Sequence, residues 1–270
     1  MPGNDAAYTH GHHESVLRSH TWRTAENSAA YLLPHLAPGM TVLDIGCGPG
    51  TVTAGLAALV DPGRVVAIDT ARPVLEQAAA HAAAAAVGDR IEFAVGDVHE
   101  LGFEDDSFDV VHAHQVLQHV GDPVGALREM RRVCRPGGIV AVRDSDYRGF
   151  FWHPQVPGLD DWMRLYVDLA RANGGTPDAG RYLLAWAHAA GFEHVTASSS
   201  TWCYADEQTR PWWGRLWADR VVQSDFARGA LAKGLADEQD LRAQSAAWLE
   251  WGAHPDGFIS LVHGEILCRA

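Results

Sequence analysis

One segment of the chain leads an apolar run directly into three glycines at alternate positions. Residues 41–51 read Thr-Val-Leu-Asp-Ile-Gly-Cys-Gly-Pro-Gly-Thr. Such an apolar run is typical of a buried strand in a parallel sheet, and glycines let the backbone adopt positive φ and approach a ligand closely. The segment therefore predicts a strand followed by a nucleoside-binding turn. A tight strand-to-helix turn without a ligand is the alternative.

The spacing of these glycines separates two classes of nucleoside ligand. A dinucleotide-binding turn places its third glycine three residues after the second and offers a helix N-terminus to a pyrophosphate. Here Gly50 follows Gly48 after only two residues. Asp44 stands just ahead of Gly46, where a negative charge would repel a phosphate but suit an ammonium group. The loop is therefore expected to bind a cationic nucleoside that carries no phosphate.

Strand-like and helix-like patterns alternate along most of the chain. The expected strands are Thr41–Ile45, Arg64–Ile68, Ile91–Val95, Phe108–Ala113, Gly138–Arg143, His194–Ser199 and Phe258–Leu267. The expected helices are Thr21–Leu36, Thr51–Leu59, Pro73–Ala86, Pro123–Val133 and Ala179–Ala190. This alternation predicts an α/β fold with a doubly wound, mostly parallel, seven-stranded sheet. Ligands of such sheets bind at the carboxyl ends of the strands, where the glycine loop lies.

Acidic residues follow the second and third expected strands. Asp69 ends the second strand, about one strand–helix unit after Asp44, and its carboxylate could accept hydrogen bonds from both hydroxyls of a ribose. A solvated acid at a strand end is the alternative. Asp97 follows the third strand beside Val98, where a carboxylate and an apolar side chain could contact the amino group and the face of an adenine.

These features together resemble the class I S-adenosylmethionine-dependent methyltransferases, which have a Rossmann-like fold. Asp44 and the three glycines match that family's acid–x–Gly–x–Gly–x–Gly loop, and residues 103–111 and 135–138 resemble its approaches to strands four and five. The layout of residues 40–145 is most similar to the ubiquinone and menaquinone biosynthesis methyltransferases. The resemblance implies S-adenosyl-L-methionine as cofactor. It also implies methyl transfer to an oxygen or carbon of a small, largely apolar molecule of the quinone, polyketide or secondary-metabolite type.

The resemblance also implies which residues contact this cofactor. They are Arg23, Asp44, Gly46, Cys47, Gly48, Asp69, Thr70, Asp97, Val98, His114 and Gln115. Arg23 or Thr24 is expected to reach the cofactor's carboxylate, with a solvated helix face as the alternative. His114 ends the fourth strand near the expected methyl position, so it is a candidate for the base that deprotonates the acceptor. Lining the cofactor and acceptor sites together with Gln115 is the alternative for His114.

The residues after the fourth and fifth strands narrow the chemistry further. The fourth strand is not followed by the Pro-Pro turn common in methyltransferases of amino bases, which lowers support for that reaction. Asp144, Asp146 and Tyr147 follow the fifth strand and are expected to face the same cleft. Two acids alone are weak evidence for a divalent metal, so we predict none.

Two other functions fit parts of the sequence. An NAD-dependent oxidoreductase would use the same layered fold, although the glycine spacing and Asp44 disfavour it. A homologue that binds the cofactor without transferring a methyl group would keep the same loop. The sequence leaves this second alternative open.

Composition excludes several classes of partner. The formal charge of −13 disfavours nucleic acids and anionic membranes, and no apolar run is long enough to span a bilayer. The four cysteines form no CxxC pair, which favours reduced thiols in a cytoplasmic protein. The expected partner is a small molecule, and the chain is expected to be a monomer or a homodimer. The histidines at positions 10, 12 and 13 could suggest a metal, but no companion ligand lies at suitable spacing.

The chain is expected to divide into four parts. Residues 1–38 form an N-terminal tail and a covering helix, 39–200 the cofactor-binding core, 201–257 a helical cap and 258–270 the last strand of the core. All but one of the ten tryptophans lie after residue 150. They could fill a core or line an apolar cavity for the acceptor, and both alternatives point to this half for substrate specificity.

Overall fold

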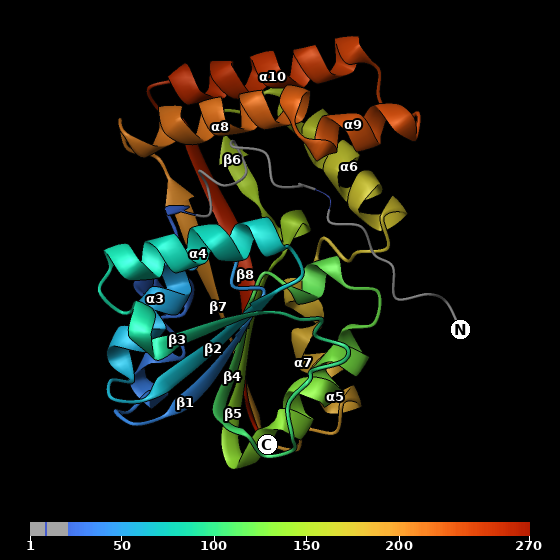
Figure 1. The fold of residues 1–270 in the computed structure, drawn as a ribbon. Coiled ribbons are helices and arrows are strands. Elements are labelled where there is room, and N and C mark those ends of the chain that lie inside the picture. The colour runs from blue at the N-terminus through green and yellow to red at the C-terminus, as the bar shows by residue number, and fades with distance from the viewer. Residues whose placement is uncertain (1–8, 10–20) are drawn as a thin grey trace.

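The computed structural model describes Thr9 and residues 21–270 of the chain (Figure 1). The three histidines at positions 10, 12 and 13 therefore lie outside the described residues. The strands are β1 (Thr41–Ile45), β2 (Arg64–Asp69), β3 (Ile91–Val95), β4 (Phe108–His114), β5 (Cys134–Ser145), β6 (Phe151–His153), β7 (Val195–Tyr204) and β8 (Phe258–Arg269). They form one sheet in the order β3-β2-β1-β4-β5-β8-β6, with β7 also paired to β8.

The sheet confirms the predicted doubly wound α/β fold. Strands β3, β2, β1, β4 and β5 pair in parallel, and only β8 runs antiparallel to its neighbours β5, β6 and β7. The sheet has eight strands where seven were expected. The additional strand, β6, is three residues long, and a segment that short carries no recognisable alternation.

Helices cover both faces of the sheet (Figure 1). The α-helices are α2 (Ala25–Ser28), α3 (Thr51–Leu59), α4 (Arg72–Ala84), α5 (Pro123–Val133), α6 (Pro157–Ala172), α7 (Leu183–Ala189), α8 (Thr209–Gln223), α9 (Asp225–Ala232) and α10 (Glu238–Ala253). Buried side chains of α2 and α3 share one apolar cluster with β1 and β2. Those of α5 and α7 share another with the opposite face of β1, β4 and β5. Alternating strand residues thus serve two cores, as in a doubly wound sheet.

The N-terminal segment differs from the single helix expected over residues 21–36. It contains α2 and a short 3-10 helix, η1 (Leu33–His35), instead. Thr24 and Asn27 form a capping box that starts α2 only at Ala25. Pro34 disfavours the α conformation for the residue before it. The apolar spacing was helical, but these two local signals confine the helix to four residues.

Four helices gather at one end of the molecule, at the top of Figure 1. Helices α8, α9 and α10 connect β7 to β8, and α6, which the sequence did not predict, packs against α9 and α10. Trp162 of α6 lies at the centre of their apolar cluster, with ring centroids 4.6 Å from Trp217 and 4.8 Å from Trp248. Most tryptophans of this half therefore fill a core.

Candidate active site

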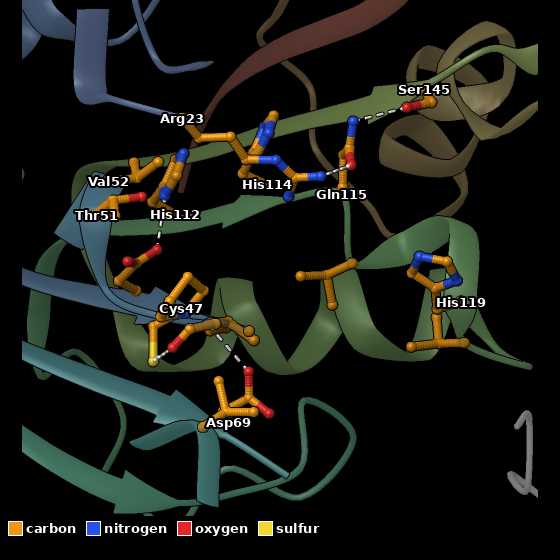
Figure 2. Close-up of a pocket in the computed structure, with 18 of the residues that line it drawn as sticks. Arg23, Cys47, Thr51, Val52, Asp69, His112, His114, Gln115, His119 and Ser145 are labelled. Carbon is orange, nitrogen blue, oxygen red and sulfur yellow. Dashed lines mark hydrogen bonds and ion pairs between the residues drawn. The ribbon is translucent and has the colours of Figure 1, made fainter. Parts of the chain in front are cut away.

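One cavity lies at the carboxyl ends of the central strands. Its wall begins with the glycine loop after β1 and the turns after β2, β3 and β4, and it continues to aromatic residues of β7 and α8. Figure 2 shows Arg23, His114 and Gln115 on one side of this pocket and Asp69 on the other. Every residue predicted to contact the cofactor lines this cavity. The fold thus brings these residues together around one cavity, and their hydrogen bonds determine what each side chain can do there.

The glycine loop has the backbone conformation that requires glycine. Gly46, Gly48 and Gly50 have φ of 66°, 55° and 78°, in the left-handed region. A Cβ atom built on Gly46 would lie 2.5 Å from Cγ2 of Val116, a residue of the turn after β4. The loop and this turn therefore approach each other closely beneath the cavity, and a side chain at Gly46 would fill that space.

Replacing Gly46 with alanine is expected to destabilise the fold by about 1–2 kcal/mol through the left-handed backbone alone, with a further cost from the contact with Val116. Urea denaturation of the variant measures the sum. The same substitution is also made in a Val116→Ala background, where the clash is removed but the backbone cost remains. Gly46→Ala is therefore expected to destabilise the Val116→Ala protein less than it destabilises the wild type. A Gly46→Ala protein as stable as the wild type would contradict this account of the loop.

Asp44 lines the cavity, and both of its carboxylate oxygens have partners within the protein. Oδ2 accepts a hydrogen bond from the Thr53 hydroxyl at 2.6 Å, and Oδ1 lies 2.8 Å from Nδ1 of His112. A carboxylate that accepts a hydrogen bond from Nδ1 fixes the orientation of the imidazole ring. Within the described part of the chain Nε2 of His112 has no partner, and His112 lines the cavity. Asp44 thus holds the His112 ring in place at the cavity wall.

His112 was not among the predicted site residues. The observation that places His112 in the site is the pairing of β4 with β1, whose register puts His112 beside Asp44. Sequence alone does not determine this register. The sign available in the sequence was the polar His112 between the apolar residues Val111 and Ala113.

Asp69 shapes the loop and retains capacity for a ligand. Its Oδ2 accepts a hydrogen bond from the backbone N–H of Gly48 at 3.1 Å, and its Oδ1 accepts one from the N–H of Ala71 at 3.0 Å. A carboxylate has about four acceptor positions, so roughly two remain for other donors. These remaining acceptor positions suit the two hydroxyls of a ribose.

The turn after β3 holds Asp97 in one orientation. Its Oδ1 lies 2.9 Å from the backbone N of His99 and 3.0 Å from Nδ1 of the same residue. The other ring nitrogen of His99 lies 3.1 Å from the carbonyl oxygen of Asp122, which fixes the imidazole between two elements. Val98 is buried beside them. An acceptor group and an apolar surface are thus adjacent, as the contact with an adenine requires.

Gln115, directly after β4, connects the N-terminal segment to β5 and β8 through its side chain. Its Oε1 accepts a hydrogen bond from Arg23 at 2.6 Å, and its Nε2 donates to the Ser145 hydroxyl at 2.8 Å. Nε2 also lies 2.9 Å from Nε2 of His263, whose Nδ1 lies 3.0 Å from the carbonyl oxygen of Leu261. The carbonyl accepts only, so Nδ1 of His263 holds the proton and Nε2 accepts from Gln115. Arg23 is therefore anchored in the site and is not part of a solvated helix face.

His114 lies in a buried environment that weakens its basicity. Burial lowers its pKa well below the usual value, and the positive charges of Arg143 and Arg23 lower it further. Among the described residues neither ring nitrogen has a hydrogen-bond partner. The centroid of its ring lies 5.7 Å from that of Trp202 and 6.4 Å from that of His263. His119, on the turn after β4, is also buried, with a pKa lowered to about 3. His114 is thus neutral near pH 7.

Two acids expected to face the cleft turn away from it. Asp144 accepts hydrogen bonds from the backbone N–H groups of Leu117 and Gln118 at 3.2 and 3.1 Å. Asp146 pairs with Arg181 through both carboxylate oxygens. Of the three residues named from the sequence, only Tyr147 lines the cavity. Within residues 21–270 no group of three metal-ligating side chains occurs.

The stability contribution of Asp144 is expected to depend on pH. Burial raises the pKa of its carboxyl from 3.8 to about 7 in the folded protein. Between about pH 4 and pH 7 the unfolded chain loses this proton while the folded chain keeps it, so stability falls as pH rises and then levels off. The measurement is urea denaturation of wild type and Asp144→Asn across this range. A stability difference that does not change with pH would contradict the assignment.

The far end of the cavity is aromatic. Trp202 of β7, Trp213 and Trp217 of α8, Tyr147 and Phe150 line it. The two alternatives for the tryptophans are therefore both realised, because three line the cavity while Trp152, Trp162, Trp248 and Trp251 are buried in the helical core. Such a wall suits an apolar or conjugated small molecule.

Comparison with known proteins identifies methyltransferases as relatives of this chain. A family model described as a methyltransferase domain matches residues 36–205, more than half of the chain. An uncharacterized methyltransferase of Schizosaccharomyces pombe is 35% identical over 278 residues, which cover 99% of this chain and 98% of that protein. A demethylmenaquinone methyltransferase of Clavibacter sepedonicus is 32% identical over 203 residues, covering 74% of this chain and 72% of that protein.

Solved structures share the fold at lower identity. A geranyl diphosphate methyltransferase, solved in complex with GPP and sinefungin, aligns with a TM-score of 0.52 and 17% identity, covering 89% of this chain and 77% of that chain. The [4+2]-cyclase SpnF aligns with a TM-score of 0.52 and 21% identity, covering 96% of this chain and 88% of that chain. At these identities the likeness shows the fold alone.

No helix within the described residues is long and apolar enough to cross a membrane.

Proposed function

The chain belongs to the S-adenosylmethionine-dependent methyltransferases, and from that premise we propose that it methylates an oxygen or carbon atom of a small, largely apolar molecule in the cavity described above. The observation that carries this proposal is one continuous cavity with a glycine and carboxylate end and an aromatic end. The name of the demethylmenaquinone methyltransferase relative supports an acceptor of the quinone type.

The residues at the first end fit S-adenosylmethionine. The positive φ of Gly46 and Gly48 exposes backbone to the cavity, and a Cβ at Gly46 would close that space. Asp69 has the free acceptor capacity that ribose hydroxyls need. Asp97 and Val98 suit an adenine, and Thr70 and Cys47 complete the wall. When bound, the cofactor supplies a methyl group made electrophilic by its sulfonium.

Other residues position the reactants and receive the proton. Arg23, held by Gln115, would bind the cofactor's carboxylate, and Asp44 holds the His112 ring in one orientation at the cavity wall. The aromatic wall excludes water and orients the acceptor, which supplies much of the rate enhancement in a displacement between two bound reactants. His114 contacts the acceptor as a neutral imidazole and is our candidate to receive its proton.

Methyl transfer is tested with an isotope label. The purified protein is incubated with methyl-labelled S-adenosylmethionine and a small-molecule extract, and products are analysed by mass spectrometry. The proposal predicts a labelled small molecule whose yield, at a limiting concentration of cofactor, is lower when Asp69→Ala replaces the wild type. Tight cofactor binding without transfer of label to any extract or to a panel of quinols and phenols would instead favour a homologue that binds the cofactor without methyl transfer.

The remaining expectations about partners are also proposals. The charge of −13 supports a chain that does not bind nucleic acid, because phosphates would be repelled. We propose a cytoplasmic monomer or homodimer. Light scattering of the purified protein determines its oligomeric state, and a mass above that of a dimer would contradict this part.

A further inference from the structure

Ser145, the last residue of β5, lies on the wall of the cavity. Strand pairing places it beside His263 of β8, and only 2% of its surface is exposed. Tyr147 and Phe150, which follow it in the chain, belong to the aromatic end of the cavity. The sheet therefore holds Ser145 where the aromatic end begins.

The hydrogen bonds around Ser145 fix the direction of its hydroxyl group. Arg23 donates to Oε1 of Gln115 at 2.6 Å, so Oε1 and Nε2 of the amide are distinguished, and Nε2 is the atom that faces Ser145. Nε2 donates to the Ser145 oxygen at 2.8 Å, along the dashed line drawn in Figure 2. An amide nitrogen does not accept hydrogen bonds, so the hydroxyl hydrogen of Ser145 points away from Gln115.

The acceptor atoms beside Ser145 are already engaged. Oε1 of Gln115 accepts from Arg23, and Nε2 of His263 accepts from Gln115. Nδ1 of His263 carries the proton that faces the carbonyl oxygen of Leu261. Among the described residues none accepts the hydroxyl hydrogen of Ser145. A buried hydroxyl without an acceptor costs free energy, so this hydrogen is a donor left for a molecule in the cavity.

The surroundings of this donor indicate which ligand group it suits. A carbonyl oxygen only accepts, so it satisfies the Ser145 hydroxyl and needs no acceptor in return. A ligand hydroxyl would bring a hydrogen of its own to a place where Gln115 and His263 have no acceptor to spare. The aromatic residues that follow Ser145 favour a flat, conjugated skeleton around that oxygen.

We propose that Ser145 determines specificity by donating a hydrogen bond to a carbonyl oxygen of the acceptor molecule, which is therefore a conjugated or aromatic carbonyl compound. The proposal rests on the proposed function, because it assigns the aromatic end of the cavity to the acceptor. An analogue without this oxygen leaves the buried hydroxyl unpaired, and a site built around a hydrogen bond rejects such analogues strongly.

Two naphthalenes of nearly the same shape test the proposal. 2-Acetylnaphthalene carries the carbonyl oxygen, and 2-isopropenylnaphthalene has a methylene group in its place. Equilibrium dialysis, with and without saturating S-adenosylhomocysteine, measures both dissociation constants for the wild type and for Ser145→Ala. The ratio of the alkene constant to the ketone constant is expected to be at least about fivefold larger in the wild type, because only the wild type offers the donor. Comparing ratios cancels the difference in hydrophobicity between the two ligands.

Two results of this comparison would overturn the proposal. The first is an equal ratio in the wild type and Ser145→Ala, which would show that the hydroxyl does not contact the oxygen. The second is a ketone that does not bind the wild type up to its solubility limit. Failure of S-adenosylhomocysteine to bind, with the difference in ratios intact, would contradict the proposed function and not this inference.

Further variants locate the donor. Ser145→Thr retains a hydroxyl and is expected to keep most of the ratio, and Ser199→Ala, at an exposed position of β7, is expected to leave it unchanged. Gln115→Glu presents a carboxylate that accepts the Ser145 hydrogen, so the ratio is expected to fall to that of Ser145→Ala although the serine is still present. Circular dichroism confirms that each variant folds, and Gln115→Glu keeps the test valid if Ser145→Ala does not fold. A wild-type ratio in Gln115→Glu would contradict the assigned direction of the hydroxyl.

Discussion

Replacing Asp69 with alanine is expected to weaken the binding of S-adenosylhomocysteine by about 1–3 kcal/mol, which corresponds to roughly 5- to 150-fold in Kd. Two effects contribute. The variant leaves the ribose hydroxyls without a charged acceptor, and it frees the N–H groups of Gly48 and Ala71 that the carboxylate holds in place. Isothermal titration calorimetry measures the change directly and does not depend on knowing the acceptor.

Two further variants separate these effects. Asp69→Asn retains one side-chain acceptor and removes the charge, so its affinity is expected to lie between those of the wild type and the alanine variant. Asp89→Ala, at an exposed position of the turn before β3, is the matched control and should bind like the wild type. Wild-type affinity in a folded Asp69→Ala protein would remove Asp69 from the cofactor site.

Replacing Trp162 with alanine is expected to destabilise the protein by about 3–5 kcal/mol. The side chain is almost completely buried, and its ring contacts Trp217, Trp248 and Tyr166 at the centre of the cluster between α6, α8 and α10. These rings cannot close a space of that size without losing their own contacts. Urea denaturation followed by far-ultraviolet circular dichroism measures the loss.

The control for this experiment lies in the same group of helices. Leu249 of α10 is 40% exposed, so Leu249→Ala is expected to change the stability by no more than about 0.5 kcal/mol. A Trp162→Ala protein within 1 kcal/mol of the wild type would show that the aromatic cluster does not stabilise this part of the fold. The cluster would then have to be explained by the cavity alone.

Local patterns were sufficient to predict the first half of the sheet. Strands β1 to β4 and helices α3 to α5 lie within two residues of their predicted bounds, because buried parallel strands and amphipathic helices alternate there with clear turn signals. Strand β6 and helix α6 were missed. Strand β6 is too short to show a period. Helix α6 does carry helical signals, since it begins at Pro157 and buries Leu159, Trp162 and Tyr166 at three- and four-residue steps, and these signals were overlooked.

The candidate site was predictable to a similar extent. The glycines, Asp69 and Asp97 follow strand ends, so their shared position follows from the topology of the sheet. The partners of other residues lie far away in the sequence: Gln115 and His263 are 148 residues apart, and Asp44 and His112 are 68 residues apart. Such pairs depend on strand order and register. Sequence reasoning therefore located Asp44 but not its partner His112.

The assignment of this cavity to S-adenosylmethionine is tested most directly by titrating the wild-type protein with S-adenosylhomocysteine and, separately, with NADH. The account predicts saturable binding of one S-adenosylhomocysteine per chain and no detectable heat from NADH, since the glycine spacing and Asp44 offer no pyrophosphate site. Tight binding of NADH together with no binding of S-adenosylhomocysteine would contradict it.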